Sequence, residues 1–250
     1  MVELYAMTCG WLGMELGTLL EGEQGRLRVP VPSYLIRHPR GTAIFDSGLH
    51  VETQVDPAAR LGKLAAVFDF EFEAGEEVEA RLESLDADPG RIDFVINSHL
   101  HFDHAGGNAQ VPNARVVLQR AEWEATQDEK LRRYNAYNPA DFDLGQELVL
   151  AEGEHDLFGD GSVVCIPTYG HTPGHQSLRV QLASGEVVLC GDSCYLRQSI
   201  EQLHVPSVLH DRDATIESLK RLRALQAQGA KHFFGHDPEF WKAVPQLTSL

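Results

Sequence analysis

Short apolar runs that end at a glycine or a polar residue recur along the chain, and they predict buried β-strands. Four of these runs are directly followed by a histidine or an aspartate. The runs cover residues 91–98, 163–170, 186–191 and 231–235, and the residues after them are His99, His171, Asp192 and His236. A rigid strand end aims the next side chain into a loop crevice. The shared position of these four residues therefore favours a common site at the strand ends of a sheet-based fold.

Three other segments have the three-to-four-residue apolar spacing of helices. They cover residues 76–85, 121–133 and 214–228. In the last of them apolar residues recur at every third position, and Gly229 supplies a plausible stop. Residues 121–133 are charged on one side, which is typical of a surface helix. We expect no chemistry on any of these helices.

The six residues 99–104 hold three histidines and one aspartate, in the order His-Leu-His-Phe-Asp-His. In an extended segment, side chains two positions apart point the same way, so His99 and His101 can both coordinate one metal ion. If the chain then turns, Asp103 and His104 face a second ion. Imidazole nitrogen and carboxylate oxygen suit zinc and similar first-row metals. The alternative is a histidine-rich surface loop, which the cost of holding four such groups together without a cation disfavours.

These stretches resemble the binuclear metallo-β-lactamase superfamily, and within it the N-acyl homoserine lactone lactonases. The resemblance begins near Pro30 and rests on residues 98–108, 170–177, 192–195 and 233–237. It implies an α+β fold, an αββα sandwich of two mixed β-sheets with flanking helices. It also implies one hydrolase domain spanning residues 1–250.

The resemblance implies a role for each candidate ligand in binding two divalent metal ions per chain. Zinc is the first expectation, with Co²⁺, Mn²⁺ or Fe²⁺ as alternatives. One ion would be held by His99, His101 and His171, the other by Asp103, His104 and His236, with Asp192 bridging both. Asp103 would also handle the proton that moves during hydrolysis. Tyr195 would reach the substrate carbonyl, and its alternative is a tyrosine of the core or of the pocket rim.

Other residues have supporting roles in this interpretation. Asp46 is expected to orient a ligand histidine rather than to bind metal, and His175 is expected either to orient a ligand or to have a structural role. Phe68, Phe70 and Phe72 alternate along residues 64–72 and predict a core strand. The lactonase resemblance offers another role for this region, in which Phe68 and Phe70, together with Phe102, line a pocket for the acyl chain. Residues 132–139 contain aromatic side chains and border either the site or a dimer contact.

The composition narrows the setting. The 43% hydrophobic and 23% charged shares are those of an ordinary globular protein. A formal net charge of −16 argues against nucleic acid as a partner and favours a small substrate that is neutral or has an uncharged face, and the family resemblance implies that it is a lactone. The four cysteines lack finger or disulfide spacing, and no signal peptide or membrane-spanning run is visible. We expect a cytoplasmic monomer or homodimer that does not contact membranes.

Three kinds of function fit the motif. The first is hydrolysis of N-acyl homoserine lactones, that is, quorum quenching. The second is hydrolysis of another substrate, such as a pyridoxolactone-type lactone, a glutathione thioester as in glyoxalase II, or a β-lactam. The third is an iron-dependent redox reaction, which the histidine at position 101 disfavours because the diiron reductases usually carry glutamate there. A non-catalytic protein that only keeps the metal cage is a further alternative.

Overall fold

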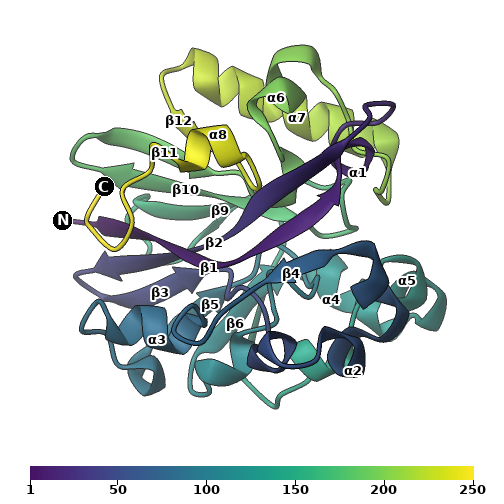
Figure 1. The fold of residues 1–250 in the computed structure, drawn as a ribbon. Coiled ribbons are helices and arrows are strands. Elements are labelled where there is room, and N and C mark those ends of the chain that lie inside the picture. Colours follow the sequence, from purple (N-terminus) through teal and green to yellow (C-terminus); the bar gives the residue numbers. More distant parts are fainter.

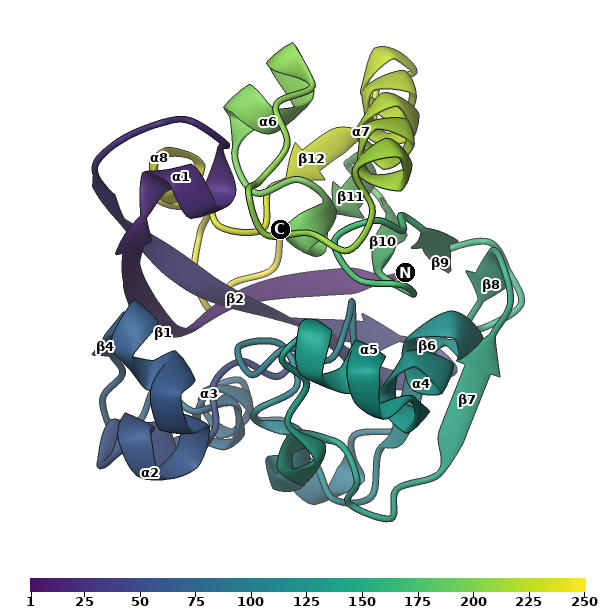
Figure 2. The same cartoon turned by 90° about the vertical axis from the view of Figure 1, so that its right-hand side faces the viewer.

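The computed structural model describes residues 1–250 and contains two mixed β-sheets packed face to face (Figures 1 and 2). The first sheet has seven strands and the second has five. In spatial order the first consists of β4 (Asp69–Glu71), β1 (Glu3–Glu15), β2 (Arg26–His38), β3 (Gly41–Phe45), β5 (Phe94–Ile96), β6 (Arg115–Gln119) and β7 (Leu148–Ala151). The second consists of β12 (Lys231–Phe233), β11 (Gly185–Leu189), β10 (Gln176–Leu182), β9 (Val163–Pro167) and β8 (His155–Asp156).

Each sheet combines parallel and antiparallel pairs. In the first, β1, β2 and β3 form an antiparallel meander, and β3, β5, β6 and β7 are parallel. In the second, only β11 and β12 are parallel. Strand β5 lies between β3 and β6, and its three residues are all buried, as expected for an internal strand covered on both faces.

The core has three apolar layers because alternate residues of a strand face opposite ways. On β9, Val163 and Cys165 point into the cluster between the sheets, whereas Val164 and Ile166 pack under α7. On β5, Phe94 and Ile96 face the same central cluster. Helices therefore cover both outer faces, with α6 and α7 at the top of Figure 1 and α3 and α4 at the bottom. This is the αββα sandwich that the resemblance implied.

The helices are short apart from α7. They are α1 (Leu16–Leu19), α2 (Pro57–Leu61), α3 (Val78–Glu83), α4 (Arg120–Gln127), α5 (Glu129–Tyr134), α6 (Arg197–Gln202), α7 (Arg212–Ala227) and α8 (Pro238–Trp241). None of them is both long and apolar enough to cross a membrane. Helices α3 and α7 lie where the apolar spacing predicted helices.

The single helix predicted over residues 121–133 is wrong, since the structure has two helices there. Asp128 is extended, with φ −88° and ψ 119°, and so ends α4. Its carboxylate accepts hydrogen bonds from the backbone N–H groups of Lys130 and Leu131, at 2.8 and 3.1 Å, and so begins α5. Aspartate is a preferred residue for this N-terminal position. The chain therefore bends at Asp128 and brings its following residues toward the strand ends.

Candidate metal centre

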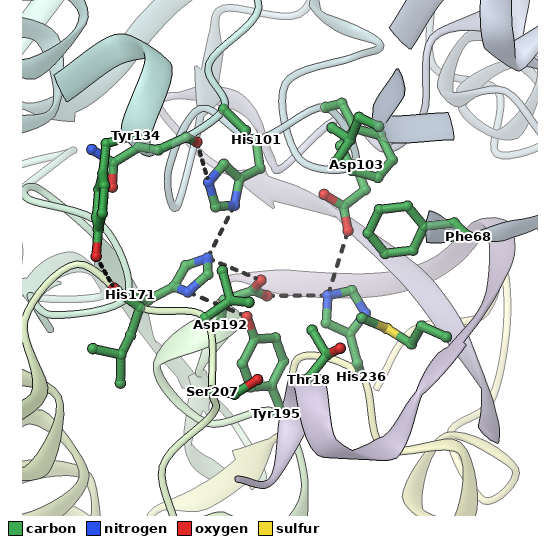
Figure 3. A pocket seen from close by; sticks show the side chains of 17 residues that line it. Thr18, Phe68, His101, Asp103, Tyr134, His171, Asp192, Tyr195, Ser207 and His236 are labelled. Atoms are coloured by element: carbon green, nitrogen blue, oxygen red, sulfur yellow. Dashed lines mark hydrogen bonds and ion pairs between the residues drawn. The ribbon is translucent and has the colours of Figure 1, made fainter. Parts of the chain in front are cut away.

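The loops after four strands bring the candidate ligands together at one edge of the sandwich (Figure 3). His99 follows β5 of the first sheet, and the other three follow strands of the second: His171 after β9, Asp192 after β11 and His236 after β12. The strand ends therefore meet as their shared sequence pattern predicted. The turn between His99 and His104 adds Asp103 to the same edge, because the backbone N–H groups of His104 and Ala105 bond back to the carbonyl of His101.

Four ligand atoms form a first group, in which all lie within 4.8 Å of one another. His101 Nδ1 lies 2.9 Å from His99 Nε2 and 3.0 Å from His171 Nε2. Asp192 Oδ2 lies 3.4 Å from His171 Nε2 and 3.7 Å from His99 Nε2. Three imidazoles and one carboxylate oxygen therefore surround one point.

Asp103, His104 and His236 form a second group next to the first, and it is gathered around the other oxygen of Asp192. Asp192 Oδ1 lies 3.2 Å from His104 Nε2 and 3.1 Å from His236 Nε2. Asp103 Oδ2 lies 3.6 and 3.7 Å from the same two nitrogens. The Asp192 carboxylate thus presents one oxygen to each group, which is the geometry of a bridging ligand.

The donor atoms fit two divalent cations. His104 Nε2 and Asp192 Oδ1 are buried, and neither makes a hydrogen bond. Buried polar atoms nearly always have a hydrogen-bond partner. Two buried atoms that face each other without one therefore indicate that a cation belongs between them. In the first group three imidazole nitrogens converge at about hydrogen-bond distance, where lone pairs repel unless a cation or protons lie between them. Nitrogen and oxygen donors in this number suit zinc and other first-row metals.

The outer nitrogens of the five histidines all have hydrogen-bond partners, at 2.7 to 3.2 Å. Three of these partners are carbonyl or carboxylate oxygens, which can only accept, so they fix the proton on the outer nitrogen. The inner nitrogen then presents its lone pair, as metal-binding histidines require. The partners are Ser98 for His99, the Asn135 carbonyl for His101, Asp46 for His104, Tyr195 for His171 and the Pro30 carbonyl for His236.

Asp46 and His175 lie outside both groups and touch their members. Asp46, in the left-handed region at φ 56°, accepts from His104 Nδ1 at 2.8 Å and from the backbone N–H of Ser98 at 2.6 Å. His175 Nε2 accepts from the backbone N–H of Asp192 at 3.0 Å. Burial lowers the pKa of His175 to about 3, so its imidazole stays neutral and can accept. Both residues are therefore placed to orient ligands.

Burial and charge divide the histidines into two electrostatic classes. Burial lowers the pKa values of the first group, His99, His101 and His171. Burial also acts to lower the pKa values of His104 and His236, but the carboxylates of Asp192 and Asp103 outweigh it and raise both. Burial would raise the pKa of Asp192, yet the same two imidazoles hold it well below its usual range. A cation at the second group must therefore displace protons.

Both groups lie at the base of a cavity of about 360 Å³ (Figure 3). His101, Asp103, His171, Asp192, Tyr195 and His236 line that base. Apolar and aromatic side chains line the rest of the cavity, among them Met14, Leu64, Phe68, Phe102, Tyr134, Val208 and Leu209. A cavity with an apolar wall and a polar base suits a small molecule that has an apolar tail.

The phenylalanines of residues 64–72 do not share one role. Phe68 lines the cavity, and its ring lies 5.2 Å from that of Phe102. Phe70, on β4, contacts both of these rings but is not among the cavity-lining residues. Phe72 is buried in an apolar cluster that also contains Phe102 and Tyr195, and Phe68 and Phe70 pack against the same cluster. The alternation therefore does place the three rings together, but only Phe68 of the three lines the cavity.

Sequence reasoning missed Glu122 and the Asn135 carbonyl. Glu122 was placed on a surface helix, but its side chain is fully buried in the first turn of α4. Asn135 lies after α5, and with Tyr134 and Ala136 it lines the cavity. The aromatic residues around Tyr134 were the one available signal, since they predicted a loop bordering either the site or a dimer contact.

Comparisons with known proteins show the family of this chain. The model of the metallo-beta-lactamase superfamily matches residues 26–236. The N-acyl homoserine lactonase AttM of Azorhizobium caulinodans is 32% identical over 249 residues, which cover 96% of this chain and 95% of the relative. An N-acyl homoserine lactonase of Bacillus cereus is 31% identical, covering 85% of this chain and 83% of the relative.

Solved structures give the same result. An N-acyl homoserine lactone hydrolase, with the product N-hexanoyl-L-homoserine bound at its catalytic metal centre, superposes with a TM-score of 0.89. It is 26% identical, and the match covers 99% of this chain and 98% of that one. The dizinc lactonase AidC superposes with a TM-score of 0.70 at 16% identity, and the match covers 95% of this chain and 88% of the AidC chain. At this identity the match supports the fold alone.

The fold is an αββα sandwich, and two neighbouring groups of histidine and aspartate side chains lie where its strand ends meet. These two features define a class of proteins that carry a candidate dimetal site. This chain belongs to the metallo-beta-lactamase superfamily. Within it, the chain is similar to N-acyl homoserine lactonases over nearly its whole length.

Proposed function

We propose that this chain, as one hydrolase domain over residues 1–250, opens the lactone ring of N-acyl homoserine lactones. The observation that carries the proposal is the Asp192 carboxylate, with one oxygen in each ligand group, at the base of an apolar cavity. The relatives named as N-acyl homoserine lactonases support the substrate class, as does the similar hydrolase that holds a ring-opened product.

The two ligand groups would hold two divalent cations, and zinc is the metal we expect. His99, His101 and His171 would hold one, Asp103, His104 and His236 the other, and Asp192 would bridge them. When bound, such a pair lowers the pKa of water toward neutrality and polarises the ester carbonyl. The apolar walls, including Phe68 and Phe102, would hold the acyl chain and keep bulk water from the base of the cavity.

Two side chains of the cavity base have further tasks. Ring opening moves a proton from the attacking water to the leaving ring oxygen. Asp103 is the one carboxylate of the base besides Asp192, and its side chain is 11% exposed toward the cavity, so it can carry that proton. The Tyr195 hydroxyl lies 3.2 Å from His171 Nδ1 and lines the same space. We assign it the hydrogen bond to the lactone carbonyl, which strengthens as negative charge develops on that oxygen.

Tyr195→Phe should keep both cations and the fold while lowering kcat/KM by roughly 5- to 100-fold. One oxyanion donor is typically worth about 100- to 1,000-fold, and cations would already carry part of the charge. The measurement is steady-state kinetics on an acyl homoserine lactone, with metal analysis of the same sample. Unchanged kcat/KM would make Tyr195 a packing residue. Loss of a cation would instead make it a support for His171.

A substrate panel tests the proposed function. Acyl homoserine lactones should open with release of one proton each, which a pH indicator records, and the product should close again on acidification. A glutathione thioester and a cephalosporin on the same panel should react far more slowly. Release of free homoserine lactone would mean amide cleavage and would contradict the proposal, as would a preference for the thioester.

A further inference from the structure

Glu122 is a fully buried carboxylate that lines no part of the cavity. Its two oxygens accept four hydrogen bonds. Oε1 accepts from the Leu100 backbone N–H at 3.0 Å and the Tyr137 hydroxyl at 2.8 Å. Oε2 accepts from the Thr172 hydroxyl at 2.8 Å and the Gly174 backbone N–H at 2.9 Å. No lysine, arginine or histidine pairs with it, so these four donors alone compensate for burying the carboxylate.

The four donors belong to three segments, of which two carry the histidines of the first ligand group and one supports His101. Leu100 lies between His99 and His101. Thr172 and Gly174 follow His171 in the loop after β9. Tyr137 lies two residues after Asn135, whose carbonyl accepts the hydrogen bond from His101 Nε2. Glu122 therefore ties together the two segments that carry the histidines of that group and the segment whose Asn135 carbonyl orients His101.

The packing around Glu122 leaves little freedom for these segments. A Cβ atom at Gly174 would lie 2.1 Å from the backbone nitrogen of Glu122, so the loop after β9 rests directly on the first turn of α4. The second ligand group has separate supports, since His104 donates to Asp46 and His236 donates to the Pro30 carbonyl. None of the four hydrogen bonds of Glu122 reaches these residues.

We infer that Glu122 is a positioning residue that sets the geometry, and so the cation affinity, of the His99–His101–His171 group and not of its neighbour. This inference rests on the metal centre proposed above but not on the identity of the substrate. Residues that hydrogen-bond to metal ligands without binding the metal typically change metal affinity by 10- to 100-fold when they are substituted. Here one carboxylate acts on three ligands through backbone and hydroxyl donors.

Glu122→Gln is the sharpest variant because it keeps the shape of the side chain. Its amide nitrogen must replace one of the two oxygens, and each oxygen accepts from a backbone N–H. In either orientation of the amide, its N–H group then faces a backbone N–H group, that of Leu100 or that of Gly174, and two donors cannot form a hydrogen bond. We expect the loop concerned to shift and zinc binding at the first group to weaken by roughly 10- to 100-fold.

The experiment measures zinc affinity by competition with a chromogenic chelator. It uses two variants of the protein, and in each of them only one of the two ligand groups is complete. In His236→Ala the remaining cation lies in the first group, and there Glu122→Gln should weaken binding by that factor. In His101→Ala the remaining cation lies in the second group, and Glu122→Gln should leave its affinity unchanged. Glu124→Gln, an exposed change on the same helix, is the matched control and should alter neither.

Two milder variants keep the test open if Glu122→Gln does not fold. Tyr137→Phe and Thr172→Val each remove one of the four hydrogen bonds and should weaken the first group alone, by a smaller factor. Equal weakening in both backgrounds would show general destabilisation and overturn the inference, as would no change in the His236→Ala background. If the unaltered protein binds fewer than two zinc ions, the proposed metal centre itself is wrong.

Discussion

Asp192→Asn is expected to remove most of the bound metal and to lower kcat/KM by at least about 1,000-fold. The change replaces one carboxylate oxygen by an amide nitrogen that has no lone pair for a cation, and it removes the negative charge shared by both groups. Metal ions contribute several kcal/mol to such reactions, and about 1.4 kcal/mol corresponds to tenfold in rate. Metal analysis and steady-state kinetics on one preparation measure both effects.

Asp213→Asn is a suitable control because Asp213 is exposed on α7 and belongs to neither ligand group. It should keep the metal content and the rate. If Asp192→Asn retained two cations and most of its activity, the bridging role of Asp192 would be wrong. The His171 and His236 contacts of its two oxygens would then be only local ion pairs.

His236→Ala should have the second largest effect, with loss of one of the two cations and a fall in activity of about 100-fold or more. His236 Nε2 lies 3.1 Å from Asp192 Oδ1, and its removal leaves the second group with two side chains besides Asp192. The second group then offers one ligand fewer than the first, so the cation of the second group should be the one that is lost. The loss of one cation from the pair removes a contribution of several kcal/mol to catalysis.

Metal analysis and kinetics of His236→Ala are compared with two other variants. His104→Ala should match it, because His104 belongs to the same group. His232→Ala makes the same change at a buried histidine that lies on β12 and belongs to neither group, and it should keep two cations. Retention of both cations in His236→Ala would remove His236 from the metal centre.

The strand ends were predictable from the sequence because apolar runs and the residues after them are local signals. Each of the runs before His99, His171, Asp192 and His236 contains a strand, and the four side chains meet. The resemblance to a known family supplied what the runs alone could not, namely which ligands share an ion. The structure adds the distances that divide the ligand atoms of the seven residues into two groups, with Asp192 between them.

The supports of the site were harder to predict because they depend on contacts between distant segments. Glu122 lies in the first turn of a helix, and a glutamate there usually faces the solvent. Only the packing of the loop after β9 on α4 shows that it is buried. The Asn135 carbonyl gives no side-chain signal at all, since any residue there would supply the same oxygen. Its role follows from the bend at Asp128 that redirects the chain.

Titration of metal-free protein with zinc, followed by activity and by elemental analysis, tests the central claim most directly. The two ligand groups predict that lactone hydrolysis is absent without metal and rises until close to two zinc ions are bound per chain. Chelation should then abolish the activity and added zinc restore it. Full activity with one firmly bound ion per chain, or activity that survives complete metal removal, would contradict a binuclear lactonase.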